Sequence, residues 1–298
     1  MKESTGKIPV LNSEDLDIFH FGQVQWQLPF ANASYLFHIN RIEDIKDKMP
    51  FPVLPHRKMV YDLIFLTKGK SIRSKGLNEY NFGKNQFFFL PALQITSHEF
   101  LSEDAEGFFV HFDLAIFKQA SLERQLNQFS FLNFLSNPII TIPEDALVPI
   151  LNILCRLEKI YLEKEGDFSL VVFYILTLFK EVSAFVVVEN TQAKSAASIL
   201  AQKYKEALSQ YIYQKQKVAE YADLLNVSPN HLNKCVKKIT SKSAQELLNE
   251  MLILEAKSLL KYSNLQTAEI AVKLFNQTPS NFARFFKKQT GFMPKEYK

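Results

Sequence analysis

Two stretches near the end of the chain repeat the same pattern of residues. The first is Val218-Ala-Glu-Tyr-Ala-Asp-Leu-Leu-Asn-Val-Ser-Pro-Asn-His-Leu-Asn-Lys-Cys-Val-Lys-Lys-Ile-Thr240. The second is Thr267-Ala-Glu-Ile-Ala-Val-Lys-Leu-Phe-Asn-Gln-Thr-Pro-Ser-Asn-Phe-Ala-Arg-Phe-Phe-Lys-Lys-Gln-Thr290. In both copies an Ala-Glu-x-Ala segment precedes a hydroxyl residue and Pro, and Lys-Lys-x-Thr ends the copy. The copies match at an offset of 49 residues before the turn and 50 after it, so the second turn holds one inserted residue.

Each copy predicts two short helices joined by a turn. The small alanines of the first helix allow another helix to cross closely. The second helix is expected to begin at Ser228-Pro229 in one copy and at Thr278-Pro279 in the other. A hydroxyl side chain caps the first free backbone N–H groups, and Pro suits the first helical position because its missing N–H would be unpaired there. This arrangement is a helix-turn-helix.

The second helix of each copy has one apolar face and one polar face. Leu232, Cys235 and Val236 are predicted to face inward, as are Phe282, Phe285 and Phe286. Amide and Arg side chains suit base edges in a major groove, and Lys side chains suit phosphates. We therefore predict that the polar faces bind DNA through Asn230, His231, Asn233, Lys234, Lys237 and Lys238, and through Ser280, Asn281, Ala283, Arg284, Lys287 and Lys288.

A longer helix is predicted between the two copies. Ser243-Ala-Gln-Glu246 has the form of a capping box that opens a helix running to about Ser263. About 20 helical residues span roughly 30 Å. Helices that read successive major grooves on one face of DNA lie about 34–36 Å apart. One rigid helix can therefore set that spacing within a single chain.

Residues 197–298 resemble the AraC/XylS family of bacterial transcription regulators. This resemblance implies DNA binding through both motifs, activation of transcription, and RNA polymerase as a partner. It rests on Ala222–Leu232, Leu254–Leu260, Glu269–Ala271, Ser280–Gly291 and Pro294–Tyr297.

The sequence departs from that family at two turns. Leu274-Phe275-Asn276 stands where the family usually has Leu-Gly-aromatic, and Ser241 stands where Gly is common. These departures put the local turn geometry and the strength of the second DNA contact in question. They leave the expected fold unchanged.

The charge of the chain is divided unevenly along its length. The whole chain carries 35 Lys and Arg against 31 Asp and Glu, a net of +4. Residues 195–298 hold 16 basic and 8 acidic residues, a net of +8, which leaves −4 for residues 1–194. A basic module joined to a mildly acidic body is typical of a protein that binds a polyanion through that module.

Residues 1–190 are predicted to form a separate domain with strands at about 20–113 and helices at about 114–188. A small polar linker is expected at 191–196. Short aromatic and β-branched runs separated by turns are typical of a β-sandwich or small barrel. The strands expected from these runs are Ser34–Asn40, Met59–Thr67, Gln86–Pro91 and Gly107–Asp113.

The N-terminal residues look like the cupin-type effector and dimerisation domains found in the same family. Helices are predicted at Glu144–Lys164 and at Asp167–Val188, where such domains dimerise. The resemblance implies a homodimer and a small-molecule effector. The expected effector residues are His56, Phe109 and His111, and the expected dimerisation residues are Leu147, Ile150, Leu151, Leu154, Leu157 and Tyr161.

The expected fold is α+β with two domains: a cupin-like β-barrel or sandwich followed by dimerisation helices, then an all-α domain with two helix-turn-helix motifs joined by a long helix. We expect a cytoplasmic protein that is no enzyme and carries no cofactor or metal, because no catalytic motif and no His-x-His occur. Lys180 and Glu181 interrupt the most apolar window, which argues against a membrane span. Two alternatives stay open: a constitutive regulator without effector, and a cupin-fold metal enzyme with a DNA-binding tail.

Overall fold

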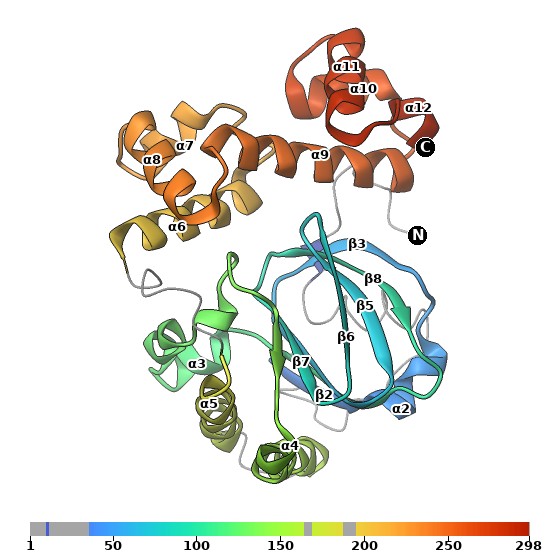
Figure 1. Ribbon diagram of the computed structural model, residues 1–298, viewed down its shortest axis with the longest axis vertical. Coiled ribbons are helices and arrows are strands. Elements are labelled where there is room, and N and C mark those ends of the chain that lie inside the picture. Colours follow the sequence, from blue (N-terminus) through green and yellow to red (C-terminus); the bar gives the residue numbers. More distant parts are fainter. Residues whose placement is uncertain (1–9, 12–35, 164–168, 187–194, 298) are drawn as a thin grey trace. The chain divides into compact units, whose positions relative to one another are not determined.

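The protein is described by a computed structural model that covers residues 10–11, 36–163, 169–186 and 195–297 (Figure 1). These residues fall into two compact units, within Val10–Glu189 and Asn190–Lys298. The predicted linker at 191–196 lies outside the described residues except for its last two. Of these, Ser195 caps the first helix of the C-terminal unit and Ala196 begins it.

The N-terminal unit contains two five-stranded sheets that face one another (Figure 1). Nearly all neighbouring strands are antiparallel; the short β1 pairs with β3 in parallel. The first sheet, in the order β1-β3-β8-β5-β6, comprises Val10–Leu11, Val53–Lys58, Ile95–Leu101, Lys70–Lys75 and Asn78–Gly83. The second, in the order β10-β7-β4-β9-β2, comprises Ile139–Thr141, Gln86–Leu90, Tyr61–Lys68, Glu106–Phe112 and Phe37–Arg41.

The second sheet is buried on both faces, which explains its continuous apolar runs. Side chains alternate across a strand, so Leu63 and Phe65 of β4 belong to one core cluster and Ile64 and Leu66 to another. The second cluster lies between the two sheets and includes Val53 of the first sheet. The first cluster lies on the outer face, where helices cover it.

One short helix, α3 (Ala115–Gln119), and two long helices cover that outer face, whereas another short helix, α2 (Ile42–Ile45), follows β2 and packs on the inner side of the sheet. The long helices are α4, Leu147–Leu162, and α5, Ser169–Ser183. Both long helices pack their buried residues into the same cluster as the outer face of the sheet. The two predicted helices therefore exist, and the described part of the second ends earlier than expected.

The expected dimerisation residues do not form a free surface. Ile150, Leu154, Leu157 and Tyr161 are 0–3% exposed within the single chain, because the outer face of the sheet already covers them. Leu147 and Leu151 are partly buried against the same cluster. The apolar face of α5, which looked equally suited to an interface, is buried there too through Val171, Val172, Ile175 and Phe179.

All four predicted strands are present within three residues of their expected ends, apart from residues 34–35, which lie outside the described part. The sequence did not predict β1, β3, β5, β6, β8 or β10. Strand β5, for example, carries Lys70, Arg73 and Lys75, which are unusual in a sheet interior. Strand β5 is held by its partners on both sides, β6 and β8. Its own residues have no strong apolar alternation by which the strand could have been predicted.

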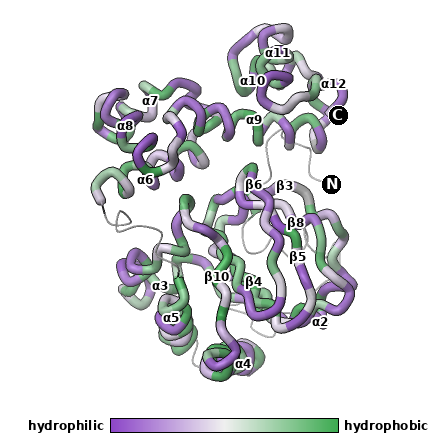
Figure 2. Tube along the Cα trace, viewed as in Figure 1, coloured by the Kyte–Doolittle hydropathy of each residue, from purple (hydrophilic) through white to green (hydrophobic). Residues whose placement is uncertain are grey.

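The C-terminal unit is entirely helical in its described residues. Figure 2 shows hydrophilic and hydrophobic residues interspersed along these helices, as expected for helices buried on one face. The helices are α6, Ala196–Tyr211; α7, Val218–Leu224; α8, Pro229–Thr240; α9, Ala244–Tyr262; α10, Thr267–Phe275; α11, Pro279–Thr290; and α12, Pro294–Tyr297.

The repeat extends to the residue that ends each second helix. Ser241 follows α8 with φ of 59°, and Gly291 follows α11 with φ of 82°. Both residues are in the left-handed conformation, and each donates its backbone N–H to the carbonyl four residues earlier. This conformation is strained for a residue with a Cβ atom and free of strain for Gly.

We expect opposite effects from exchanging these two residue types. Ser241→Gly removes the backbone strain and should raise the free energy of unfolding by about 1 kcal/mol, whereas Gly291→Ala introduces it and should lower that free energy by about as much. The space around Gly291 is open, so a methyl group there meets no neighbouring atom and only the backbone cost remains. Urea unfolding followed by circular dichroism measures both changes. A Ser241→Gly variant that is less stable than the wild type would contradict a strained left-handed conformation at residue 241.

Candidate DNA-binding surface and barrel interior

The second helix of each motif begins as its sequence predicts. Ser228 Oγ accepts a hydrogen bond from the backbone N–H of His231 at 3.2 Å, and Thr278 Oγ1 accepts one from Asn281 at 3.4 Å. Pro occupies the first turn of both helices. The two helices are therefore capped in the same way and present equivalent positions to their surroundings.

The predicted inward faces are largely confirmed. Leu232, Cys235 and Val236 of α8 are buried, as are Phe282 and Phe286 of α11. Phe285 is only partly buried and packs against Phe275 with ring centroids 5.2 Å apart. The exposed residues among those predicted to bind DNA are Asn230, His231, Lys234, Lys237 and Lys238 on α8, and Ser280, Asn281, Arg284, Lys287 and Lys288 on α11.

Two of the residues predicted to bind DNA, Asn233 and Ala283, are partly buried. Asn233 also forms a hydrogen bond within the protein. Ala283 is half-covered on α11. Asn233 Oδ1 accepts a hydrogen bond from the backbone N–H of Ala244 at 3.0 Å. This N–H is one of the four at the start of α9 that have no partner within the helix. The Asn233 side chain thus helps to fix α9 relative to α8, and its carbonyl oxygen is occupied.

The Arg284 side chain is held in place by its own helix. Its Nη2 donates a hydrogen bond to Asn281 Oδ1 at 2.6 Å, one turn earlier on α11. Both residues are exposed. The remaining guanidinium N–H groups can form the bidentate hydrogen bonds by which Arg recognises guanine. On α8, by contrast, His231 Nε2 lies 3.7 Å from the Sγ atom of Cys235.

The helix α9 connects the two motifs and contacts each at a different end. Near its start, Tyr204 of α6 donates its hydroxyl to the carbonyl of Ala244, beside the Asn233 contact. Ser243 and Glu246 form the predicted capping box. Near its other end, Lys257 Nζ lies 5.3 Å from the ring centroid of Tyr297. Its 19 residues span about 28 Å.

The turn inside each of the two motifs is built with asparagine. Asn226 follows α7 with φ of 56°, and Asn276 follows α10 with φ of 46°. Asn adopts the left-handed conformation more readily than other residues that carry a Cβ atom. The second motif therefore makes its turn without the glycine usual in the family.

The three predicted effector residues all lie in the buried part of the N-terminal unit. His56 of β3 is 0% exposed, Phe109 of β9 is 3% exposed and His111 is 6% exposed. The rings of Phe109 and His111 are in contact, with centroids 4.3 Å apart. The strand therefore brings these two side chains to one face.

A charged cluster that the sequence did not predict surrounds His111. Arg73 Nη2 donates to Asp62 Oδ2 at 2.5 Å, and Lys58 Nζ donates to the same oxygen at 2.6 Å. Lys58 Nζ lies 3.1 Å from His111 Nε2. All four side chains are buried. The available signal was Asp62, a lone carboxylate within the apolar strand β4.

Burial and mutual contact change the pKa values of this cluster. Burial lowers the pKa of Lys58 to about 7, although Asp62 opposes the change. For Asp62, burial alone would raise the pKa, but Arg73 and Lys58 hold it well below its usual range. The pKa values of His98 and His111 are lowered by burial and by nearby cations, so both rings are neutral at neutral pH.

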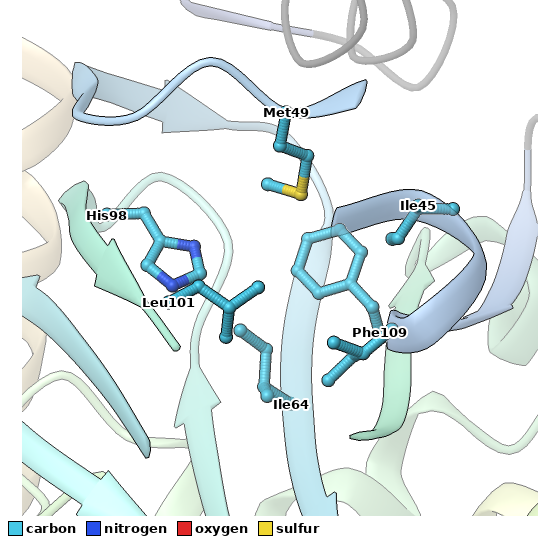
Figure 3. Close-up of a pocket in the computed structure, with 7 residues that line it drawn as sticks. Ile45, Met49, Ile64, His98, Leu101 and Phe109 are labelled. Carbon is cyan, nitrogen blue, oxygen red and sulfur yellow. The ribbon is translucent and has the colours of Figure 1, made fainter. Parts of the chain in front are cut away.

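A small apolar pocket lies beside this cluster. Figure 3 shows the rings of His98 and Phe109 and the thioether of Met49 directed toward one space. The cavity has a volume of about 10 Å³, about the space that one water molecule needs and far below the 300–1,000 Å³ of typical ligand pockets. The other lining residues are Ile42, Ile45, Ile64 and Leu101.

Two features are absent from the described residues. Among them, no group of three or more His, Cys, Asp or Glu side chains is arranged to hold a metal ion. None of the helices in the described ranges is long and apolar enough to cross a membrane.

The chain is similar to known helix-turn-helix proteins. Residues 221–298 match the sequence model of a family described as "Helix-turn-helix domain". A curated relative, "Uncharacterized HTH-type transcriptional regulator YisR" of Bacillus subtilis (strain 168), is 24% identical over 121 residues, which are 41% of this chain and 42% of that protein. The match thus spans less than half the length of this relative.

Solved structures are similar to parts of the chain or to most of it. The C-terminal domain of AraT from Geobacillus stearothermophilus is 28% identical with a TM-score of 0.32, over 35% of this chain and 86% of that chain. ToxT from Vibrio cholerae is 14% identical with a TM-score of 0.41, over 88% of this chain and 97% of that chain.

The observed role of Asn233 leads to a prediction. Asn233→Ala removes the acceptor for the Ala244 N–H and should lower the free energy of unfolding by about 0.5–1.5 kcal/mol. The matched control is Lys234→Ala on the exposed face of the same helix, which should change that free energy by less than about 0.5 kcal/mol. Urea unfolding measures both, and equal stabilities of the two variants would refute the capping role.

Proposed function

We propose that this protein, whose C-terminal unit carries an AraC-type helix-turn-helix domain, is a sequence-specific DNA-binding transcription regulator. In this proposal α8 and α11 enter successive major grooves on one face of the DNA. The observation that carries it is the repeated geometry: two equally capped helices, each exposing amide and basic side chains. The helix α9, about 28 Å long, contacts α8 directly and joins α11 through α10 and α12.

The two helices are proposed to contribute differently. On α11, Arg284 is already oriented by Asn281 and is the strongest candidate for reading a base edge. On α8, Asn233 is engaged with α9, so Asn230 and His231 near the helix start remain for base contacts. The lysines farther along both helices are suited to phosphates, which carry no sequence information.

Further features of the regulator belong to this proposal. Activation through RNA polymerase and a cytoplasmic location rest on the family resemblance alone. Control by a small effector rests on the family resemblance and on the buried charged cluster of the N-terminal unit. A constitutive regulator is the alternative if no ligand binds there. The cupin-fold metal enzyme with a DNA-binding tail is the second alternative, and stoichiometric metal in the purified protein would favour it.

A homodimer is also proposed, with a different interface from the one first expected. Val148 and Leu162 of α4 and Phe173 of α5 are exposed apolar residues, 65%, 59% and 55% respectively. These residues are accessible to a second copy of the chain, whereas the buried residues Ile150, Leu154 and Leu157 of α4 are not. Sedimentation of Leu162→Lys tests this: a wild-type dimer that the substitution leaves intact would exclude Leu162 from the interface.

DNA selected from a random pool by the full-length protein provides the test of function. Because phosphate neutralisation releases counterions, affinity should fall steeply with salt. Lys238→Ala should weaken binding to selected and unrelated DNA about equally and reduce the salt slope by about 1. Arg284→Ala should cost about 1–3 kcal/mol on selected DNA only.

The matched control for these variants is Lys203→Ala, an exposed lysine of α6 outside both recognition helices. It should leave the affinity for selected DNA within about twofold of wild type. Failure to enrich any sequence would overturn the proposal. So would an Arg284→Ala variant that binds selected and unrelated DNA as the wild type does.

A further inference from the structure

The segment between α6 and α7, residues 212–217, contacts both α9 and the second motif. The hydroxyl of Tyr213 donates a hydrogen bond to Glu255 Oε2, in the middle of α9, at 2.5 Å. The side chain of Gln216 donates through Nε2 to the backbone carbonyl of Lys273 at 3.4 Å. Lys273 belongs to α10, the first helix of the second motif, whereas the segment leads into α7, the first helix of the first motif. A side-chain contact therefore joins the two motifs in addition to their common packing on α9.

The first motif holds this segment in place. Glu220 Oε2 of α7 accepts hydrogen bonds from the backbone N–H groups of Gln216 at 2.9 Å and Lys217 at 2.8 Å. Tyr221 of the same helix donates its hydroxyl to the carbonyl of Lys215 at 2.8 Å. The carbonyl of Lys215 and the N–H of Gln216 belong to one peptide group, so α7 holds that group from both sides. Gln216 is therefore fixed relative to α7, and its side chain extends from that position to α10.

The contact between Tyr213 and Glu255 involves a carboxyl group within the core. Glu255 is 0% exposed and lies in the run Met251–Ala256, which is buried at every position. A buried polar group is costly unless it is hydrogen-bonded, and a hydrogen bond requires its donor at a defined position. Apolar contacts have no such directional requirement. The hydrogen bond therefore favours one setting of the segment on α9.

Recognition of two grooves requires a defined angle between the recognition helices as well as a defined distance. Adjacent base pairs of DNA are rotated by about 35° and separated by about 3.4 Å. The length of α9 sets a distance along its own axis. The rotation of one motif around that axis, relative to the other, depends on how each motif contacts α9 and on how the motifs contact one another. Tyr213 makes a contact of the first kind and Gln216 one of the second.

We propose that Tyr213 and Gln216 are positioning residues, which fix the angle between α8 and α11 and so restrict the protein to one spacing of its two half-sites. They act through α9 and α10, while the side chains of α8 and α11 make the contacts with DNA. This inference rests on the proposed function for its meaning in DNA binding. A protein whose recognition helices already have the angle of the complex loses less conformational freedom on binding, and it rejects DNA of another spacing.

Binding of the full-length protein to DNA of altered spacing tests this role. The probes are the selected DNA, the same DNA with one base pair inserted or deleted between the half-sites, and DNA that retains one half-site. The wild type should bind the selected spacing at least about 10-fold tighter than either altered spacing. Gln216→Met keeps the length of the side chain without its N–H groups, so it should reduce that ratio at least about threefold, while the affinity for one half-site stays within about twofold of wild type. A wild type that binds every spacing equally, or an unchanged ratio in Gln216→Met, would overturn the proposal.

Two further variants separate this role from a general effect on the segment. Gln214→Met is the matched control, because Gln214 is exposed in the same segment and its replacement should keep the wild-type ratio within about twofold. Tyr213→Phe removes the hydroxyl and should lower the ratio as Gln216→Met does. A ratio lowered equally by Gln214→Met would refute the role of Gln216, and a folded Tyr213→Phe variant with the wild-type ratio would refute that of Tyr213. Should Tyr213→Phe fail to fold, Gln216→Met against Gln214→Met decides the matter, because neither of these side chains is fully buried.

The angle is also measured without DNA, by spin labels on the two recognition helices. The labels are attached at Lys238→Cys and Lys288→Cys, which are exposed positions, in a chain that also carries Cys155→Ser and Cys235→Ala. Pulsed electron paramagnetic resonance should give a narrow distribution of label distances with Gln216 and a broader one with Gln216→Met. If no DNA sequence is selected, the proposed function fails, and these distributions still decide the positioning role. If DNA is selected and Gln216→Met changes neither the ratio nor the distribution, the positioning role fails and the proposed function stands.

Discussion

The C-terminal unit depends on the burial of one helix, α9. A short helix-turn-helix has too little apolar surface to form a core of its own. The run Met251–Ala256 is buried at every position, because α9 is covered by helices of both motifs. Its start is fixed by the Ser243–Glu246 capping box and by Asn233 of α8. A helix held in this way is stiff, and it determines the separation of the two motifs.

The N-terminal unit is governed by a comparable constraint. Its second sheet is apolar on both faces, so it requires cover on both. The first sheet covers one face and helices α4 and α5 cover the other, which accounts for the apolar composition of both helices. The space between the sheets then receives a charged cluster along with its apolar side chains. Such a cluster is costly to bury, because its charged groups lose their hydration.

Sequence reasoning succeeded where the signal was local. The helix starts at Ser228, Thr278 and Ser243 follow from capping chemistry within four residues, and the structure has all three. Sequence reasoning failed where the environment of a segment depends on residues that are distant in the chain. Whether an apolar helix such as α4 faces its own sheet or a second copy depends on residues far away in the chain. The pairing of Arg73 with Asp62 likewise arises only when β4 and β5 enter opposite sheets.

The recognition residues fall between these two cases. Periodicity placed Lys237, Lys238 and Arg284 on exposed faces, and they are exposed. The same periodicity placed Asn233 there, but the start of α9 lies close enough to engage its side chain. The hydrogen bond between Asn281 and Arg284 could have been anticipated, since residues three apart on a helix are neighbours.

The most direct test of the central claim changes the spacing between the two contacted grooves. Selected DNA is lengthened between the two half-sites by about half a helical turn or by about one full turn, roughly 5 or 10 base pairs. A rigid α9 predicts that both insertions reduce the affinity to that of a single half-site, even though the full turn restores the same face of the DNA. Full affinity after the one-turn insertion would contradict a spacing fixed by α9.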